Sequence, residues 1–365
     1  MSLKCGIIGV ANVGKSTLFN CMSTTRVETS SAAFTSNRSN LGVVTVPDPR
    51  LYHLPNYQST GKVVPATVDI VDIPGLTRGA SHGEGVGNKF LADIRNTDAL
   101  IHVLRCFEDD SLPHIDGSVD PVRDIETIDL ELQVKDLESV EKKMERLARV
   151  AKSGDKEAKE AIEVLEKYRA HLEDFRNIRT LEVNEAEKKH AEDLFLLTSK
   201  PVLYVCNVED DAALKGNPHV EQVRSYLEGK EEEMLVLAAR LESEIAELEE
   251  EEDRRAFLED AGLEEPGVNK LIRSAYSLLD LISFFTMNPR EIHAWTIRKG
   301  TMAREAAGVI HSDMQRGFIR AEVIRYEDLV SLGSEHACRE AGKLSVEGKN
   351  YIVRDGDILQ IRFNV

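Results

Sequence analysis

The first part of the chain alternates short apolar runs with segments of helical periodicity. The apolar runs are nearly continuous, which is typical of strands buried on both faces of a parallel sheet. They occupy residues 5–10, 67–74, 99–107, 201–207 and 234–239. Because helical segments lie between these runs, the pattern predicts a doubly wound α/β domain.

A long insertion between residues 108 and 200 interrupts this alternation. Apolar residues recur there in steps of three and four, first over 134–151 and again over 162–178. The polar stretch KSGDKE separates the two series. The pattern predicts two antiparallel helices joined at Ser153–Gly154, packed against each other along their apolar stripes.

Two further regions follow the alternating part. The acidic run at 241–255 is expected to be an exposed helix rather than a binding tail. A smaller domain is expected to start near Leu281, because short strand signals separated by glycine turns follow. Those signals are HAWTIR (293–298), GFIRAEVI (317–324) and DILQIRF (357–363).

Composition narrows the class of protein. Hydrophobic residues make up 42% and charged residues 30%, as in an ordinary globular protein. No apolar stretch approaches the ~20 residues of a membrane span, and the N-terminus is unlike a signal peptide. We therefore expect a cytoplasmic protein with no membrane partner. The five widely spaced cysteines predict reduced thiols, and His102, inside an apolar run, is expected to be a packed core residue.

Charge is distributed unevenly along the chain. The net charge is −18, which argues against a protein that coats nucleic acid over its whole surface, and we expect no DNA partner. Residues 286–365, however, carry 12 basic and 11 acidic residues, so the remainder carries −19. The basic residues gather in one stretch with only four acids, and such a stretch is a candidate contact for RNA phosphates. They are Arg290, Arg298, Lys299, Arg304, Arg316, Arg320 and Arg325.

The stretch GVANVGKST at 9–17 fits the phosphate-loop motif G-x-x-x-x-G-K-[ST]. It follows an apolar strand signal and precedes a helical one, as the motif requires. In such a loop the backbone amides cradle phosphates, Lys15 reaches the β- and γ-phosphates, and the Ser16 hydroxyl binds Mg²⁺. The loop residues expected to bind the nucleotide are Asn12, Val13, Gly14, Lys15, Ser16 and Thr17.

Two more motifs follow at the ends of later strands. Asp72 and Gly75 form D-x-x-G, in which the carboxylate holds a metal-bound water and the glycine amide contacts the γ-phosphate. This motif argues against a small-molecule kinase. Asn207 and Asp210 match N-[TK]-x-D, whose carboxylate reads guanine, although Val208 replaces the usual lysine. Ala239 lies one strand later, where a second base-contacting loop is expected.

The chain resembles the YchF/Obg-like ATPase family over essentially its whole length. The resemblance rests on the order of the motifs, on the helical insertion, and on the stretches WTIRKGTMAREAAGVIHSDMQRGFIRAEVI and VRDGDILQIRFNV. The resemblance implies a P-loop G domain, a coiled-coil arm and a C-terminal TGS domain of β-grasp, ubiquitin-like shape. It also implies a monomer that hydrolyses ATP slowly, often accepts GTP, and associates with the large ribosomal subunit and its RNA. The expected domains are 1–125 and 200–280 for the G domain, 126–199 for the arm and 281–365 for the TGS domain.

The chain departs from the family at three places. Ala11 stands where a proline is usual. Alignment on Phe34 and Asn40 places Ser36 at the position of the threonine that binds Mg²⁺. The usual N-x-x-E becomes N-V-E-D, so that Asp210 occupies the guanine-reading position while Val208 cannot pack along the base as a lysine would. These opposing effects predict that ATP and GTP bind within about tenfold of each other, with ATP slightly favoured by the resemblance.

The motifs do not identify the group that positions the attacking water. Leu76 stands where signalling GTPases have a glutamine, and leucine cannot hydrogen-bond water. His114 and His82, both on polar loops after strands, are the candidates, and the family usually has a histidine at the position of His114. A bound K⁺ held by Asn12 is a further candidate, by analogy with cation-dependent relatives.

We therefore expect a regulatory P-loop ATPase/GTPase that uses Mg²⁺. Two rival functions remain open at this stage. One is a GTP-specific switch of the Obg kind, which competition between the two nucleotides would reveal. The other is a ribosome- or RNA-binding scaffold whose nucleotide site only sets its conformation, which would show no turnover with ribosomes.

Overall fold

The computed structural model describes residues 3–24, 40–75, 86–114 and 116–364. It forms two compact units. The first contains residues up to Thr24, those around 40–42, and 69–268. The second contains residues 43–68 together with 269–364.

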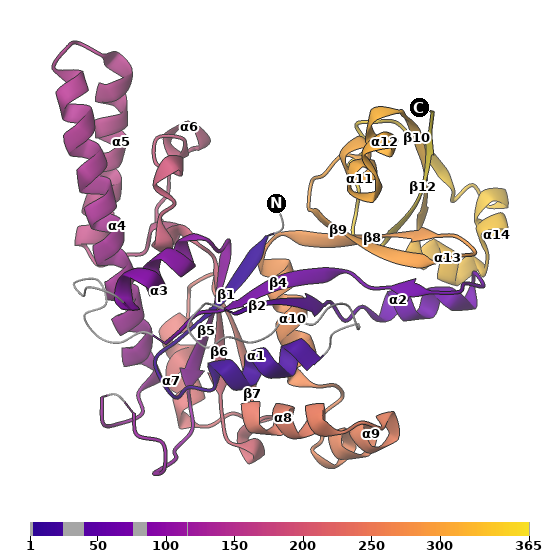
Figure 1. Ribbon diagram of the computed structural model, residues 1–365, viewed down its shortest axis with the longest axis horizontal. Helices are drawn as coiled ribbons and strands as arrows, with labels where there is room; N and C mark the ends of the chain where they lie inside the picture. The colour runs from indigo at the N-terminus through magenta and orange to yellow at the C-terminus, as the bar shows by residue number, and fades with distance from the viewer. Residues whose placement is uncertain (1–2, 25–39, 76–85, 115, 365) are drawn as a thin grey trace. The chain divides into compact units, whose positions relative to one another are not determined.

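The first unit is built on a six-stranded sheet, coloured indigo to salmon in Figure 1. Its order is β2 (Asn40–Thr45), β4 (Thr67–Asp72), β1 (Lys4–Ile8), β5 (Ala99–Arg105), β6 (Val202–Asn207) and β7 (Glu233–Leu237). From β4 to β7 each neighbouring pair is parallel. The five strands predicted from apolar runs are confirmed, each slightly shorter than its run, and so is the doubly wound α/β class.

Burial explains why the central strands have no polar alternation. Every residue of β5 and β6 is buried, so both faces of these strands need apolar side chains. Because β1, β4 and β6 are parallel, their carboxyl ends meet at one edge of the sheet. The three motifs therefore reach the same edge, where open parallel sheets bind ligands.

Helices cover this sheet. α1 packs against α8, and α4 against α7. The helices of this unit, and the one leading into the second, are α1 (Lys15–Thr24), α3 (Val86–Arg95), α4 (Pro121–Ala151), α5 (Lys156–Glu173), α6 (Glu185–Lys188), α7 (Pro218–Leu227), α8 (Ala239–Glu247), α9 (Glu251–Asp260) and α10 (Gly267–Leu278). Short 3₁₀ turns lie at Ile178–Thr180, Glu192–Leu194, Leu197–Ser199 and Asp210–Ala212.

The predicted helical pair is present as α4 and α5, which lie side by side in Figure 1. Asp120 and Asp155 cap the two helices by accepting backbone N–H groups of their first turns. The turn between them contains Ser153–Gly154, as predicted, and Gly154 adopts φ +92°. Their shared apolar stripe includes Val140, Leu165, Tyr168 and Leu172.

The expectation of one exposed helix over 241–255 was wrong. The run is divided between α8 and α9, and Glu242 in α8 is only 3% exposed. Its carboxylate accepts the backbone N–H groups of Gly267 and Val268 at 2.7 and 3.1 Å. An acidic residue in this run therefore caps the start of α10 inside the protein.

Two predictions about single side chains are confirmed. His102 is 2% exposed in β5, and burial lowers the pKa of its imidazole to about 3. All five cysteines are buried, and none of them forms a disulfide. Among the helices of the described ranges, none has both the length and the apolar character needed to cross a membrane.

The second unit is built on a mixed six-stranded sheet. Its order is β11 (Ser345–Glu347), β10 (Phe318–Arg325), β12 (Asp357–Phe363), β8 (Leu281–Met287), β9 (Ile292–Arg298) and β3 (Val63–Val64). Phe284, Ala306, Val323 and Leu359 belong to its core. The helices are α2 (Pro49–His53), α11 (Ala303–Ile310), α12 (Ser312–Arg316), α13 (Tyr326–Leu332) and α14 (Glu335–Glu340), with a 3₁₀ turn at Leu54–Asn56. The three strand signals are confirmed as β9, β10 and β12, and the β-grasp class with them.

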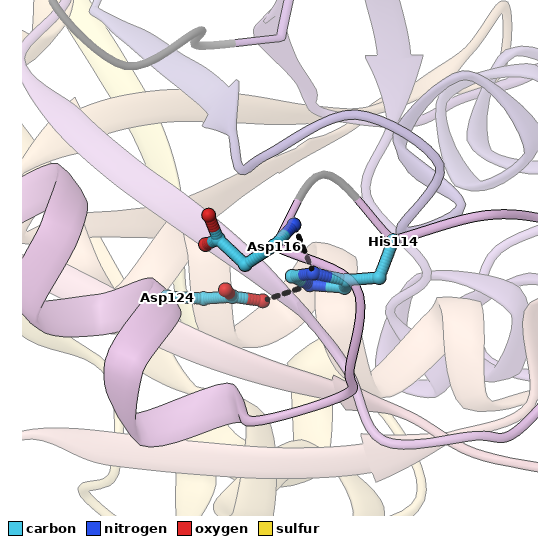
Figure 2. A group of neighbouring side chains, drawn as sticks. All are labelled: His114, Asp116 and Asp124. Carbon is cyan, nitrogen blue, oxygen red and sulfur yellow. Dashed lines mark hydrogen bonds and ion pairs between the residues drawn. The ribbon is translucent and has the colours of Figure 1, made fainter.

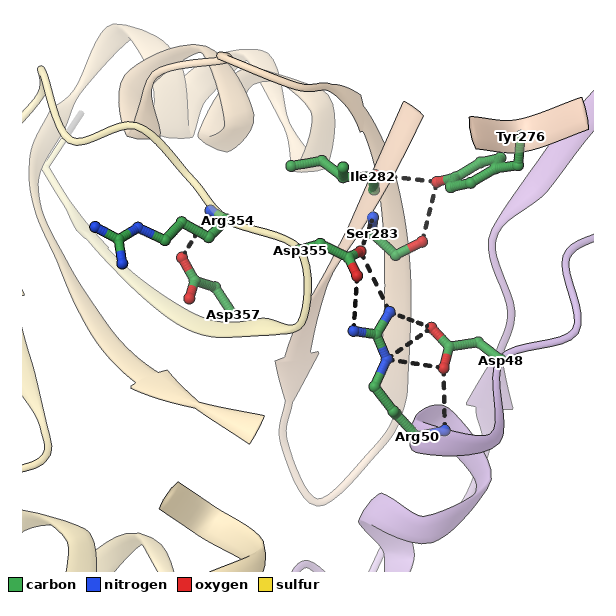
Figure 3. Close-up of polar contacts among 8 residues, drawn as sticks. All are labelled: Asp48, Arg50, Tyr276, Ile282, Ser283, Arg354, Asp355 and Asp357. Carbon is green, nitrogen blue, oxygen red and sulfur yellow. Dashed lines mark hydrogen bonds and ion pairs between the residues drawn. The ribbon is translucent and has the colours of Figure 1, made fainter. Parts of the chain in front are cut away.

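Arg50 attaches residues 43–68 to the rest of this unit (Figure 3). Its guanidinium donates to Asp48 from Nε at 3.0 Å and to Asp355 from Nη1 at 2.8 Å. Asp355 in turn accepts the backbone N–H of Ser283 at 3.0 Å. The segment that follows β2 in the chain thus belongs to the C-terminal unit. The predicted start of the C-terminal domain at residue 281 stays a prediction. The compact unit itself begins earlier in the chain, since it also contains residues 269–280.

Candidate functional site

The loop after β1 has a backbone that only certain residues allow. Gly9 has φ +150°, and a Cβ there would lie 2.5 Å from the Val103 carbonyl oxygen. Gly14 has φ +96°, and its Cβ would lie 2.4 Å from Asn207 Nδ2. Asn12 has φ +62°, a conformation that asparagine tolerates better than most residues. The two motif glycines are therefore required by close approach as well as by φ.

Lys15, the first residue of α1, points back over this loop. Its Nζ donates to the carbonyl oxygens of Gly9 at 3.1 Å and Val10 at 2.6 Å. Burial lowers the pKa of Lys15 to about 8, and the charge of Asp72 opposes that shift. A Cβ on Gly75 would lie 3.0 Å from Lys15 Nζ, so the D-x-x-G backbone reaches the amine.

Ser16 and Asp72 form the candidate metal pair. The exposed Ser16 hydroxyl donates to Asp72 Oδ2 at 3.3 Å. Burial raises the pKa of Asp72, while Lys15 and the Ser16 hydrogen bond act in the opposite direction. A hydroxyl and a carboxylate are the hard oxygen ligands that Mg²⁺ prefers, and the rest of its shell is usually water and phosphate. The residues present therefore fit a magnesium ion beside the loop.

Asn207, the last residue of β6, connects the loop to α8. Its side chain is 4% exposed, and Nδ2 donates to the Val13 carbonyl at 2.9 Å. Its Oδ1 accepts the backbone N–H of Ala239 at 2.8 Å. One amide thus satisfies groups of the phosphate loop and of the segment that starts α8.

A pocket of about 640 Å³ runs along this edge of the sheet. It brings together all ten residues predicted to bind nucleotide, from Asn12–Thr17 to Asn207, Val208, Asp210 and Ala239. Sequence reasoning missed the rest of the lining, since no motif marks those positions. These residues are Phe107, Glu108, Asp109, Leu112, Glu209, Arg240 and Ser243.

The two neighbouring acids after Asn207 have different surroundings. Glu209 accepts the Glu108 backbone N–H and the Asn217 side-chain amide, each at 3.0 Å. Asp210 has its Oδ2 3.7 Å from Arg240 Nε, and its Oδ1 has no hydrogen-bond partner among the described residues. Both carboxylate oxygens of Glu209 are therefore engaged within the protein, and the base-reading role of Asp210 stays a prediction.

His114 lies in the loop between β5 and α4, as predicted, and it is buried there. The histidine is 9% exposed, and its Nε2 lies 3.0 Å from Asp124 Oδ2 (Figure 2). The preceding residue, Pro113, accepts the Asn12 side-chain amide at 3.2 Å, which places this segment beside the phosphate loop. Its role in hydrolysis stays a prediction.

Three residues of the sequence analysis lie outside the described residues. They are His82, a second candidate for positioning water, Ser36, the proposed second Mg²⁺ ligand, and Leu76. Their roles stay predictions.

Comparison with known proteins decides the family. Residues 281–364 match the family model YchF-GTPase_C, described as "Protein of unknown function (DUF933)", and residues 4–167 match MMR_HSR1, described as "50S ribosome-binding GTPase". The chain is 47% identical to "Ribosome-binding ATPase YchF" of Bacillus subtilis, with 100% of each chain covered. The chain belongs to the YchF family. The YchF protein of Escherichia coli O157:H7 is 45% identical, again over 100% of both chains.

A solved YchF structure agrees with this assignment. The Schizosaccharomyces pombe YchF GTPase superposes with a TM-score of 0.88 at 34% identity, covering 99% of this chain and 98% of that one. The resemblance to YchF proteins read from the motifs is thus confirmed. So is the predicted combination of a P-loop domain with a C-terminal domain.

Proposed function

We propose that this chain is a P-loop triphosphatase that associates with the ribosome and hydrolyses ATP, and also GTP, slowly. It acts as a monomer in the cytoplasm, and its hydrolysis serves regulation linked to translation or stress. The observation that supports the proposal is the Asn207 amide, which binds both the loop after β1 and the start of α8 beside one pocket. The names of the YchF relatives support ATP and the ribosome as its partners.

Different residues of the site contact different parts of the triphosphate and its metal ion. The loop amides and Lys15 hold the β- and γ-phosphates, for which a buried lysine is a strong electrostatic partner. Ser16 and Ser36 bind Mg²⁺, Asp72 holds a water bound to the ion, and the ion neutralises phosphate charge when bound. Gly75 presents its backbone amide to the γ-phosphate beside Lys15. K⁺, held by Asn12, is proposed as an auxiliary cation of the loop.

A single-turnover assay tests the triphosphatase. The wild-type chain with Mg²⁺ is expected to hydrolyse ATP and GTP slowly, and ribosomes to raise the rate. Lys15→Ala should weaken triphosphate binding at least tenfold, about 1.4 kcal/mol, because it removes the ammonium group that reaches the β- and γ-phosphates. Lys188→Ala, an exposed lysine in α6, is the matched control. Full binding by Lys15→Ala would refute the phosphate loop, and no turnover with or without ribosomes would favour the scaffold.

Base choice rests on Asp210. An aspartate facing guanine N1–H and N2–H₂ makes two charge-assisted bonds, which adenine cannot supply. Asp210→Ala should therefore weaken GTP more than ATP in competition calorimetry, turning affinities within about tenfold into a clear ATP preference. Asp211→Ala, the exposed neighbouring acid, should change neither affinity. Equal losses for both nucleotides would assign base choice to backbone groups near Asn207 and Ala239.

The ribosome contact is assigned to the basic stretch of the C-terminal unit, toward RNA of the large subunit. Within that stretch Arg316, Arg320 and Arg325 already lie beside carboxylates of their own unit. Arg298 and Lys299, at the end of β9, are both exposed and adjacent. They are therefore the charges best suited to meet phosphates.

Reversing both charges tests this contact. Arg298→Glu with Lys299→Glu should weaken co-sedimentation with ribosomes and flatten its salt dependence, because fewer counterions are released. Lys343→Glu with Lys349→Glu makes the same change of charge on exposed residues of the same unit. If both pairs of substitutions behave alike, the contact lies on the arm or the P-loop domain instead.

A further inference from the structure

The two ring nitrogens of His114 have different partners, and these fix its tautomer. Nδ1 accepts the backbone N–H of Asp116 at 3.1 Å. A backbone N–H can only donate, so Nδ1 carries no proton. The neutral ring then carries its proton on Nε2 and donates it to Asp124 Oδ2 at 3.0 Å (Figure 2).

This tautomer argues against a metal at the same cluster. One ligand atom from each of His114, Asp116 and Asp124 lies within 4.8 Å of the others, which is close to the spacing of metal ligands. A metal needs a free imidazole lone pair, however. Here one lone pair accepts an N–H, and the other nitrogen is protonated toward a carboxylate. Hydrogen bonding, and not coordination, accounts for the cluster.

We propose that Asp124 is the positioning residue that holds His114 as the Nε2–H tautomer, so that Nδ1 is the atom that accepts a hydrogen bond from the attacking water. The proposal rests on the proposed role of His114 in hydrolysis. The backbone N–H of Asp116 occupies the position from which a water O–H would donate to His114 Nδ1. A water O–H can donate to Nδ1 once the Asp116 N–H leaves that position, and the ring itself does not have to turn.

Asp124 is well placed for this task. It is 1% exposed and lies in the first turn of α4, where Asp120 caps the helix and accepts the Asp124 backbone N–H at 3.1 Å. The orienting carboxylate thus belongs to a long, capped helix. The imidazole it orients follows Pro113, whose carbonyl is bound to Asn12 of the phosphate loop. A rigid element therefore aims a ring that is anchored beside the phosphates.

The carboxylate also supplies charge where the reaction needs it. As the water oxygen bonds to the γ-phosphorus, its proton passes to Nδ1, and the bond to the β-phosphate oxygen breaks with its electron pair. The imidazolium formed is stabilised by Asp124, and it returns the proton to the phosphate product. Burial raises the pKa of Asp124, and the hydrogen bond and charge of His114 oppose that shift, so the two groups support each other's charged forms.

Imidazole ¹⁵N NMR of the full-length chain, combined with single-turnover hydrolysis, tests the proposal. The spectra are recorded with Mg²⁺ and a non-hydrolysable ATP analogue, where the proposal has a water in place of the Asp116 N–H at Nδ1 and Asp124 alone holds the proton on Nε2. Under these conditions wild-type His114 should show the Nε2–H tautomer, and Asp124→Ala should lose it. Asp124→Ala should lower the rate of ATP hydrolysis at least a hundredfold, while ATP affinity changes less than threefold. Asparagine has nearly the same shape as aspartate. If the alanine variant folds poorly, Asp124→Asn should show the same loss of the tautomer and the same fall in the rate of hydrolysis.

The control removes a carboxylate from another histidine pair. In the C-terminal unit His336 Nε2 lies 3.4 Å from Glu340 Oε1 on an exposed helix, and Glu340→Ala should change neither the His114 signals nor the rate. If His114→Ala lowers turnover while Asp124→Ala and Asp124→Asn keep the tautomer or the full rate, Asp124 does not position His114, although the proposed function stands. If His114→Ala keeps full turnover, the water role fails and this proposal fails with it.

Discussion

The candidate site depends on one buried amide, that of Asn207. A single side chain cannot satisfy the Val13 carbonyl and the Ala239 N–H unless β6, the phosphate loop and the start of α8 keep fixed positions. β6 is held in turn between β5 and β7 in the parallel sheet. Gly14 follows from the same contact, because any side chain there would collide with the amide. The phosphate-loop end of the pocket and the end predicted to contact the base are thereby set together.

The charges at the phosphate end are balanced against burial. Burial disfavours the charged form of both Lys15 and Asp72, and each partly restores the other. The carbonyls of Gly9 and Val10 add partners for the ammonium group. A triphosphate with Mg²⁺ brings both an anion for the lysine and a cation for the carboxylate. The site is thus suited to a ligand that carries both charges at once.

Local patterns in the sequence predict what depends on local physics. Continuous apolar runs predict the buried parallel strands, and heptad-like spacing predicts α4 and α5, because each pattern follows from the element's own burial. The phosphate loop is recognisable because its glycines are needed for backbone reasons. The strand β8 and the assignment of residues 43–68 to the C-terminal unit were not predicted, since the latter depends on Arg50 meeting Asp355, more than 300 residues later in the chain.

The surroundings of polar side chains were the least predictable part. His114 lies in a polar stretch that reads as an exposed loop, yet Asp124 from the next helix buries it. Glu242 lies in an acidic run, yet it caps α10. Glu209 and Asp210 are adjacent acids, and only their partners show that both carboxylate oxygens of Glu209 are engaged within the protein. In each case the deciding group comes from another element, which no local pattern reveals.

Calorimetric titration of Asn207→Ala with Mg²⁺·ATP and with Mg²⁺·GTP tests the central claim most directly. Since the amide sets loop geometry and does not act on one base alone, both affinities should fall at least tenfold, about 1.4 kcal/mol, and by similar factors. The thermal unfolding of the variant, measured alongside, shows whether the fold is retained. Unchanged affinity for both nucleotides in a folded Asn207→Ala chain would contradict the account.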